Sequence, residues 1–480
     1  MAPNSDVEVA KEYHTATKHS PISIRMSLHS LDWPNKPLPF KVYKRLQTVT
    51  LPTDFSKPSM STLEAISSTH RDGGALDLKT LAQILYFSAG ITKKAPMPGG
   101  EEYYFRAAAC AGALYPVEVY VICGDVRDLP PGVYHFSPKE FALTRLRAGD
   151  FRPHVAAATG ETTAAPAILV LTGIFWRSAW KYQARSYRYC FWDSGTILAN
   201  LLATATSAGL RAKIVGGFLD ERVDLLLGID GEREGSLCLV QLGLGGAAKG
   251  EETELPPLET DVVPLSREEV DYPEIRRIHA ASSLVSEEKV KSWKGHLRRE
   301  PRALHGRTFP LESRLPSGKP LGEVILRRGS TRRFRHAPIG LDHLSAILHR
   351  STKGFEADFL DGPRTDLLDI YLIINSVEGL PSGAYYFSPT QAELELLKEG
   401  AFRRTAGFLC LEQPLAADAS AVVFFLADLQ KVLRRFGNRG YRVAQLEAGI
   451  VGGKMYLAAY SLGLGATGLT FYDDEITTFF

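Results

Sequence analysis

Three polar side chains spaced two residues apart stand out in the stretch RRGSTRRF. Arg328, Ser330 and Arg332 place two guanidinium groups and one hydroxyl near the start of a helical segment. Guanidinium groups and hydroxyls donate hydrogen bonds that match the oxygens of a phosphate or a carboxylate. A solvated basic turn has the same composition, and this run alone does not separate it from an anion site.

A second stretch has a composition typical of a binding site for a flat ring. RAAACAGALYP, residues 106–116, consists mostly of small side chains. Small side chains let a planar ligand approach the backbone, whose N–H and C=O groups can then bond the polar edge of the ring. Tyr115-Pro116 closes the stretch. A tight loop without a ligand is the alternative interpretation.

The sequence predicts neither a dinucleotide-binding fingerprint nor a metal site. Gly463, Gly465 and Gly468 have the spacing of a dinucleotide-binding fingerprint, but they follow an apolar helical stretch. The fingerprint requires a strand before the glycines and a helix after them, so we predict no such site. The 12 histidines show no metal-ligand spacing such as HExxH, and no metal is predicted.

These stretches belong to a chain that repeats itself. GVYHFSP at 132–138 recurs as GAYYFSP at 383–389, an offset of 251 residues. LDLKTLAQIL at 76–85 recurs as IGLDHLSAIL at 339–348, an offset of 263. Residues from Arg185 onward recur at 254, which aligns Asp220-Glu221 with Asp474-Glu475. Because the matches keep their order across three blocks, we interpret the chain as a duplicated domain.

Each copy keeps a stretch that the other lacks. The change of offset from 263 to 251 leaves 12 residues missing from the second copy, and the loss includes the small-residue loop. Where the second copy has RRGSTRRF, the first has SSTHRDGG at 67–74. A titratable pair, Lys181-Tyr182, also occurs only in the first copy, since its counterparts are Arg435 and Phe436.

Hydrophobic spacing predicts the elements that must position these stretches. Apolar residues at i, i+3 and i+7 predict amphipathic helices, short β-branched runs predict strands, and long apolar stretches ending in glycine predict core helices. The predicted helices cover 78–85, 193–209, 341–348 and 447–463, and the predicted strands include 117–123, 167–171, 369–374 and 421–427. An acidic, proline-rich linker and a charged helical stretch at 275–299 separate the copies. The predicted class is α+β, with each copy a sheet packed by helices.

Composition narrows the function classes. At 480 residues the chain has room for two or three domains, and its net charge of +2 without a basic run argues against nucleic acid. No apolar run is long enough to span a bilayer, and the N-terminus lacks the apolar core of a signal peptide. Five cysteines without a CxxC spacing argue for reduced thiols. We therefore expect a cytoplasmic protein without a membrane partner.

Together these residues resemble the nitroreductase-fold flavoproteins, and more narrowly the tandem SagB/ThcOx-type dehydrogenases, which oxidise azolines to azoles in peptide natural products. The resemblance extends from residues 13–20 and 31–44 to the last residues. It implies a nitroreductase-like fold duplicated in one chain, forming an intramolecular pseudo-dimer. The implied segments are an N-terminal arm (1–60), a first domain (61–246), a linker with a charged helical segment (247–318) and a second domain (319–480) that lacks the family's final strand.

The resemblance implies an FMN site. In the family an R-x-S-x-R run holds the FMN phosphate, and here it is Arg328, Ser330 and Arg332. A P-S-x-G-x-L-Y-P loop lies along the isoalloxazine ring, and a further segment, here 467–471, lies beside its reactive edge. The matching flavin-binding residues are Ala109, Cys110, Gly112, Ala113, Leu114, Gly468, Leu469 and Thr470. Cys110 replaces the family's serine, which removes a hydroxyl donor.

The resemblance also implies catalytic residues. Lys181-Tyr182 falls on a Lys-Tyr pair that is catalytic in related azoline dehydrogenases. A lysine acting as a base near neutral pH needs a pKa below its ordinary value of about 10.4, and we expect Arg185 and Arg188 to lower it. Tyr182 would donate or relay a hydrogen bond. A surface lysine beside a core aromatic residue is the alternative.

The complementary losses lead to an expected stoichiometry of one FMN per chain. One cleft combines the first copy's loop with the second copy's phosphate grip, and the other cleft lacks both. The expected activity is FMN-dependent oxidation of thiazoline or oxazoline rings in a peptide-derived product. The alternatives are an NAD(P)H-dependent nitro or quinone reductase and a non-catalytic flavin-binding subunit. A small molecule or peptide is the expected substrate, with delivery by a partner protein and a homodimer of chains left open.

Overall fold

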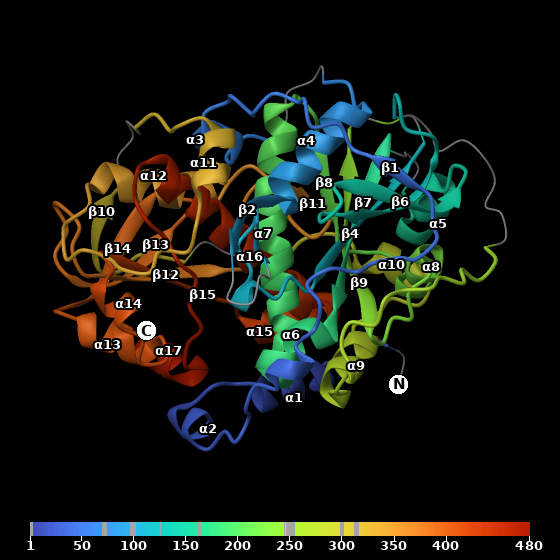
Figure 1. Ribbon diagram of the computed structural model, residues 1–480. Helices are drawn as coiled ribbons and strands as arrows, with labels where there is room; N and C mark the ends of the chain where they lie inside the picture. The colour runs from blue at the N-terminus through green and yellow to red at the C-terminus, as the bar shows by residue number, and fades with distance from the viewer. Residues whose placement is uncertain are drawn as a thin grey trace.

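The computed structural model describes residues 3–69, 74–96, 102–124, 126–161, 165–243, 245, 255–297, 302–311 and 316–480. Two sheets lie on opposite sides of a central pair of long helices, α7 (Ser186–Ser207) and α16 (Arg439–Ser461) (Figure 1). The first sheet belongs almost entirely to the first half of the sequence and the second sheet to the second half. The fold therefore divides as the sequence repeat does.

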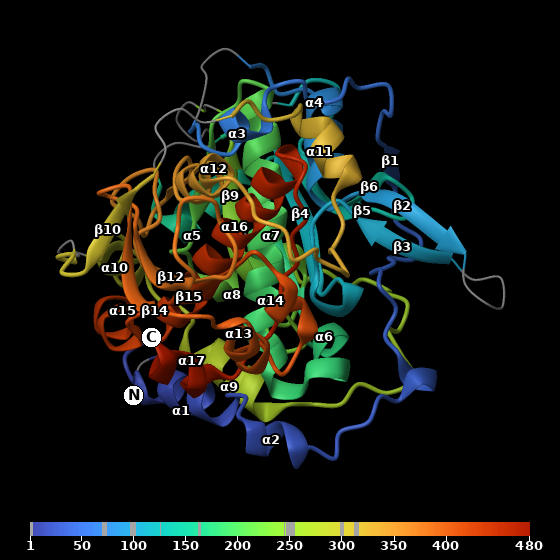
Figure 2. The ribbon, with the colours of Figure 1, turned by 90° about the vertical axis from the view of Figure 1, so that its left-hand side faces the viewer.

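The first half is built on an eight-stranded sheet in the order β1-β6-β5-β4-β7-β9-β8-β11. Its strands are antiparallel except that β11, which comes from the second half, is parallel to β8. The strands are β1 (Thr48–Thr50), β4 (Val117–Cys123), β5 (Gly132–Ser137), β6 (Ala142–Ala148), β7 (Ala167–Ile174), β8 (Ala212–Val215), β9 (Glu234–Leu242) and β11 (Glu356–Ala357). The helices are α1 (Glu8–Ala16), α2 (Pro21–Arg25), α3 (Thr62–Ala65), α4 (Leu78–Ala89), α5 (Arg152–Thr159), α6 (Phe175–Tyr182), α7 and α8 (Asp220–Leu227). A projecting hairpin of β2 (Ile91–Pro96) and β3 (Glu102–Arg106) leads into the small-residue loop (Figure 2).

The second half contains an antiparallel five-stranded sheet in the order β10-β14-β13-β12-β15. Its strands are β10 (Arg307–Pro310), β12 (Asp369–Ile374), β13 (Gly383–Ser388), β14 (Glu393–Glu399) and β15 (Ala421–Leu426). The helices are α9 (Pro273–Ala281), α10 (Glu287–Trp293), α11 (Leu321–Arg327), α12 (Leu341–Ser351), α13 (Arg403–Leu409), α14 (Pro414–Asp418), α15 (Leu429–Phe436), α16 and α17 (Asp473–Phe479). Within the described ranges, this sheet has no counterpart of β9.

The two central helices cross at a pair of glycines that occupy the same place in the repeat. A Cβ atom on Gly195 would lie 2.4 Å from the carbonyl carbon of Gly449, and one on Gly449 would lie 2.5 Å from the carbonyl oxygen of Trp192. Any larger residue would push the helices apart. The halves thus pair through the same helix position, as subunits do at an isologous dimer interface.

An aspartate of the second half lies between two arginines of the first. Arg185 and Arg188 donate to Asp473 at 2.8 and 2.7 Å, and all three side chains are buried. Burial by itself would raise the pKa of Asp473, but the two guanidinium groups outweigh burial and hold this pKa below its ordinary value. These arginines, which we expected to act on Lys181, therefore have a different partner.

The mirror image of this cluster joins the halves a second time. Arg439 and Arg442 of the second half donate to Asp220 of the first at 2.6 and 2.7 Å. The structural counterpart of Asp220 is thus Asp473, and the sequence alignment with Asp474 is wrong by one residue. The exchange of like clusters gives the interface an approximate twofold symmetry.

The repeat also includes helices α1 and α9, which sequence matching did not detect. The carbonyl of His14 accepts a hydrogen bond from Arg188 at 2.8 Å, and the carbonyl of His279 accepts one from Arg442 at 2.6 Å. Each helix therefore completes one of the arginine clusters. The N-terminal arm and the charged stretch of the linker play equivalent parts in the two halves. Residues 247–254, 298–301 and 312–315 of the linker lie outside the described residues.

Candidate functional site

The small-residue loop between β3 and β4 is anchored on the central helix α7. The hydroxyl of Thr196 donates to the carbonyl of Ala109 at 2.6 Å, and Asp193 accepts from the N–H of Ala111 at 2.9 Å. Three residues of the loop have a left-handed backbone conformation, with φ of 63° at Gly112, 52° at Ala113 and 51° at Tyr115. Such conformations cost energy outside glycine and persist only where the surroundings hold them.

Lys181 and Tyr182, at the end of α6, face this loop. A Cβ atom on Gly112 would lie 2.8 Å from the Tyr182 hydroxyl and 3.4 Å from Lys181 Nζ. Lys181 Nζ lies 5.2 Å from the centre of the Tyr182 ring. Burial, reinforced by neighbouring Tyr189, raises the pKa of Tyr182, so its hydroxyl stays protonated as a donor. The structure thus brings the Lys-Tyr pair to the loop.

The segment 467–471 of the second half reaches the same place through Tyr189. The ring of Tyr189 contacts that of Tyr182 edge-on, with 4.5 Å between centroids, and its hydroxyl lies 3.4 Å from Thr470 Oγ1. Trp192 lies 6.2 Å from the ring of Phe471. Leu469, by contrast, packs against the core of the second half. Aromatic side chains therefore wall the seam between the halves.

Arg328 ties the basic loop of the second half to the small-residue loop of the first. Its Nε donates to the carbonyl of Ala107 at 3.0 Å and its Nη2 to the carbonyl of Arg106 at 3.2 Å. Two of its nitrogens are thus engaged by the loop. Ser330 and Arg332 are exposed, and Arg332 lies near enough to Tyr103 of the hairpin to interact electrostatically.

Tyr456 on α16 was not predicted to belong to the site, yet it links two of its parts. Its hydroxyl lies 3.4 Å from Ser330 Oγ and accepts from the N–H of Gly468 at 2.5 Å. The N–H of Thr331 also donates to the carbonyl of Ala466 at 2.9 Å. The basic loop and the segment 467–471 are therefore fixed relative to each other.

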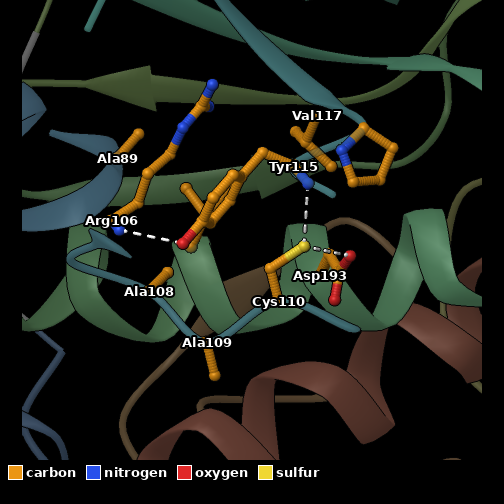
Figure 3. Close-up of a pocket in the computed structure, with 10 residues that line it drawn as sticks. Ala89, Arg106, Ala108, Ala109, Cys110, Tyr115, Val117 and Asp193 are labelled. Atoms are coloured by element: carbon orange, nitrogen blue, oxygen red, sulfur yellow. Dashed lines mark hydrogen bonds between the residues drawn. The ribbon is translucent and has the colours of Figure 1, made fainter. Parts of the chain in front are cut away.

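Asp193 is a second residue that sequence reasoning missed. A pocket beneath the loop is lined by Ala89, Arg106, Ala108, Ala109, Cys110, Tyr115, Pro116, Val117, Asp193 and Ile197 (Figure 3). Burial raises the pKa of Asp193 to about 7, against the opposing effect of two hydrogen bonds. The Cys110 thiol donates to Asp193 at 3.0 Å, so the cysteine replaces the donor that we expected the loop to lose.

The donor set at this seam fits a flat ring joined to a phosphate. The loop exposes no bulky side chain, and glycine at 112 lets the Lys-Tyr pair approach the backbone of the loop closely. Ser330 and Arg332 supply a hydroxyl and a guanidinium group at the solvent side. The residues present therefore fit the group that the resemblance implies, FMN.

The second cleft is filled by the protein itself. By the offset of 253 that aligns Asp220 with Asp473, Gly216 and Gly217 hold the position of Leu469 and Thr470. Their N–H groups both donate to Asp358, at 2.7 and 2.9 Å. The side chains of Trp293 and Phe359 also pack against these glycines. Residues 70–73 of the first-half stretch SSTHRDGG, the counterpart of the basic run, lie outside the described residues.

Neither a metal-binding cluster nor a membrane-spanning helix occurs within the described ranges. They contain no group of three or more histidine, cysteine, aspartate and glutamate side chains that could hold a metal ion. None of their helices is both long and apolar enough to cross a bilayer.

Comparison with known proteins matches both halves to one family. The profile of the nitroreductase family matches residues 73–244 and 325–478. A Methanocaldococcus jannaschii protein named as a nitroreductase is 30% identical over 171 residues, which cover 35% of this chain and 81% of the relative. The Escherichia coli protein McbC, named for microcin B17 processing, is 26% identical over 197 residues, covering 36% of this chain and 69% of McbC.

A solved structure extends the likeness to the whole chain. The crystal structure of an Anabaena variabilis protein, also named as a nitroreductase, superimposes with a TM-score of 0.80 at 27% sequence identity. The superposition covers 98% of this chain and 96% of that one. The two chains therefore share the complete architecture of paired halves.

Proposed function

The chain belongs to the nitroreductase family of oxidoreductases, and on this premise we propose that it is an FMN-dependent dehydrogenase that oxidises thiazoline or oxazoline rings to azoles in a peptide-derived product. The two matched segments confirm the predicted fold class, a nitroreductase-like fold duplicated in one chain. They also confirm the resemblance to nitroreductase-fold flavoproteins. The cofactor, the substrate class and the site residues are our proposal.

One observation carries the proposal. Lys181 and Tyr182 lie at Gly112 of the small-residue loop, in the half that supplies this loop, and the other half has neither the loop nor the pair. A reductase that only relays electrons from NAD(P)H needs no base at this position, whereas removal of a ring proton does. The similarity to McbC, named for microcin B17 processing, supports a peptide-derived substrate.

The residues have defined roles in this proposal. Ser330, Arg332 and the remaining nitrogen of Arg328 would hold the phosphate, and the loop from Ala109 to Leu114 would lie along the ring. Gly468, Leu469 and Thr470 form the segment beside its reactive edge. FMN, when bound, supplies the acceptor for the hydride that leaves the azoline ring.

Lys181 and Tyr182 handle the proton. Aromatising an azoline removes a proton and a hydride from the ring, and Lys181 Nζ would take the proton from carbon. Tyr182 stays protonated because burial raises its pKa, so its hydroxyl donates a hydrogen bond that orients the ring. The rings of Tyr189 and Trp192 pack beside this pair and would form an apolar wall of the site.

The filled second cleft supports one FMN per chain. Asp358, Trp293 and Phe359 take the place of a ligand at Gly216 and Gly217, so the duplicated fold keeps a single seat.

A reduction reaction is the second candidate, favoured by the likeness to the Methanocaldococcus jannaschii relative. Anaerobic stopped-flow mixing separates the two. With a dehydrogenase we expect NADPH to leave the flavin absorbance unchanged and a thiazoline peptide to bleach it. Rapid bleaching by NADPH alone would instead establish a reductase. A colourless protein that cannot be reconstituted with FMN would contradict both and favour a non-catalytic subunit.

A further inference from the structure

The two central helices carry buried carboxyl groups at the same place in the repeat. Asp193 on α7 and Glu447 on α16 are 254 residues apart, and their exposed fractions are 5% and 0%. Each lies beneath the loop that precedes a strand of its own half, β4 for Asp193 and β12 for Glu447. Each accepts hydrogen bonds from the backbone of that loop. The chain therefore contains the same arrangement twice: a buried carboxyl group on a central helix that accepts hydrogen bonds from the loop above it. One copy lies at the proposed cofactor site and the other lies away from it.

At the proposed cofactor site the carboxyl group of Asp193 contacts the loop partly through the thiol of Cys110. Asp193 accepts from the N–H of Ala111 at 2.9 Å. It also accepts from the Cys110 thiol at 3.0 Å, and Cys110 Sγ accepts from the N–H of Tyr115 at 3.1 Å (Figure 3). This chain of hydrogen bonds spans the left-handed residues Gly112 and Ala113 and ends on a third, Tyr115. It therefore holds both ends of the strained part of the loop.

In the second half the equivalent carboxyl group, Glu447, stabilises a loop that lies away from the proposed cofactor site. Glu447 accepts from the N–H groups of Asp366 and Leu367, at 2.8 and 3.2 Å, and from the hydroxyl of Thr365. Left-handed conformations are strained outside glycine, and the second loop has no such non-glycine residue between Asp358 and Leu368. Glu447 stabilises a relaxed loop, whereas Asp193 stabilises a strained one.

We infer that Asp193 is a positioning residue which, through Cys110, sets the shape of the loop that meets the isoalloxazine ring. The inference rests on the proposed function, because it assumes that the loop from Ala109 to Leu114 binds FMN. Without the carboxylate, the thiol loses its acceptor and the constraint on Tyr115 is released. The loop then relaxes away from the geometry that fits the ring, and the lysine-tyrosine pair faces a displaced Gly112.

The test compares Asp193→Asn with Glu447→Gln. The two variants replace a carboxyl group with an amide at equivalent helix positions, so a purely structural role predicts the same outcome for both. We expect both to lower the melting temperature. Only Asp193→Asn should weaken FMN binding, by about tenfold or more in a fluorescence titration, and shift the absorbance maximum of bound flavin. Equal FMN affinity and an unchanged spectrum in Asp193→Asn would overturn the inference.

Cys110 provides a second route to the same answer. Cys110→Ser keeps a donor and an acceptor and should bind FMN as the wild type does, whereas Cys110→Val removes both and should reproduce Asp193→Asn. If Asp193→Asn does not fold, the serine and valine variants decide, and equal affinity in these two overturns the inference. A wild-type protein that takes up no FMN overturns the proposed function as well, which distinguishes the two failures.

Discussion

Replacing Lys181 with alanine is expected to lower kcat/KM for azoline oxidation by about 10²–10⁴-fold while the protein keeps its FMN. A Cβ atom on Gly112 would lie 3.4 Å from Lys181 Nζ, which places this basic group beside the loop. The hydroxyl of Tyr182 cannot serve as the base instead, because burial raises its pKa and keeps it protonated. The loss of two hydrogens from a thiazoline peptide, followed by mass spectrometry, measures the activity. The flavin absorbance shows whether the cofactor stays bound.

The repeat supplies a matched control. Arg435 is the counterpart of Lys181 in the second half, where it donates to the carbonyls of Lys294 and His296. Arg435→Ala removes a basic side chain from the equivalent position without touching the proposed site, and we expect wild-type turnover. Full azole formation by the Lys181→Ala variant would remove the base assignment.

The second large effect concerns stability. Asp473→Asn leaves Arg185 and Arg188 buried without a counter-charge, and breaking a buried ion pair by removing one partner costs about 3–5 kcal/mol of unfolding free energy. Because the pKa of Asp473 is lowered in the folded protein, its stabilisation is present above the ordinary aspartate pKa of about 3.9 and is lost as pH falls through the folded pKa. The variant should therefore lose less stability on acidification than the wild type. Denaturant unfolding at several pH values measures both.

Two neighbouring positions make this prediction specific. Asp474→Asn alters an aspartate that is exposed and paired with Lys18 at the surface, so it should change stability little. Asp220→Asn breaks the mirror cluster with Arg439 and Arg442 and should resemble Asp473→Asn. If Asp473→Asn and Asp474→Asn were equally stable, the reciprocal clusters would not hold the halves together.

Short elements with a local pattern were predictable from the sequence. The strands predicted at 117–123 and 369–374 match β4 and β12, because contiguous β-branched residues mark a buried strand. The helix predicted from residue 193 begins instead at Ser186. Its first turns contain Arg188, which is buried only because Asp473, far away in the sequence, neutralises it. No local pattern contains that information.

The parts of the site also differ in how far they can be predicted from the sequence. The basic run, the small-residue loop and the Lys-Tyr pair have distinctive compositions, and the structure places them at one seam. Asp193 and Tyr456 are single polar residues within long helices and carry no such signal. Comparing the copies offered one clue, since Asp193 aligns with Glu447, a second carboxyl group in an otherwise apolar stretch. The filling of the second cleft by Trp293 depends on tertiary packing alone.

A crystal structure of the protein with FMN bound tests the central claim most directly. We predict one FMN per chain, with its isoalloxazine ring along Ala109–Leu114 and its phosphate at Ser330 and Arg332. Gly216 and Gly217 should remain covered by Asp358 and its neighbours. A second flavin at those glycines, or a ring bound away from the small-residue loop, would contradict the account.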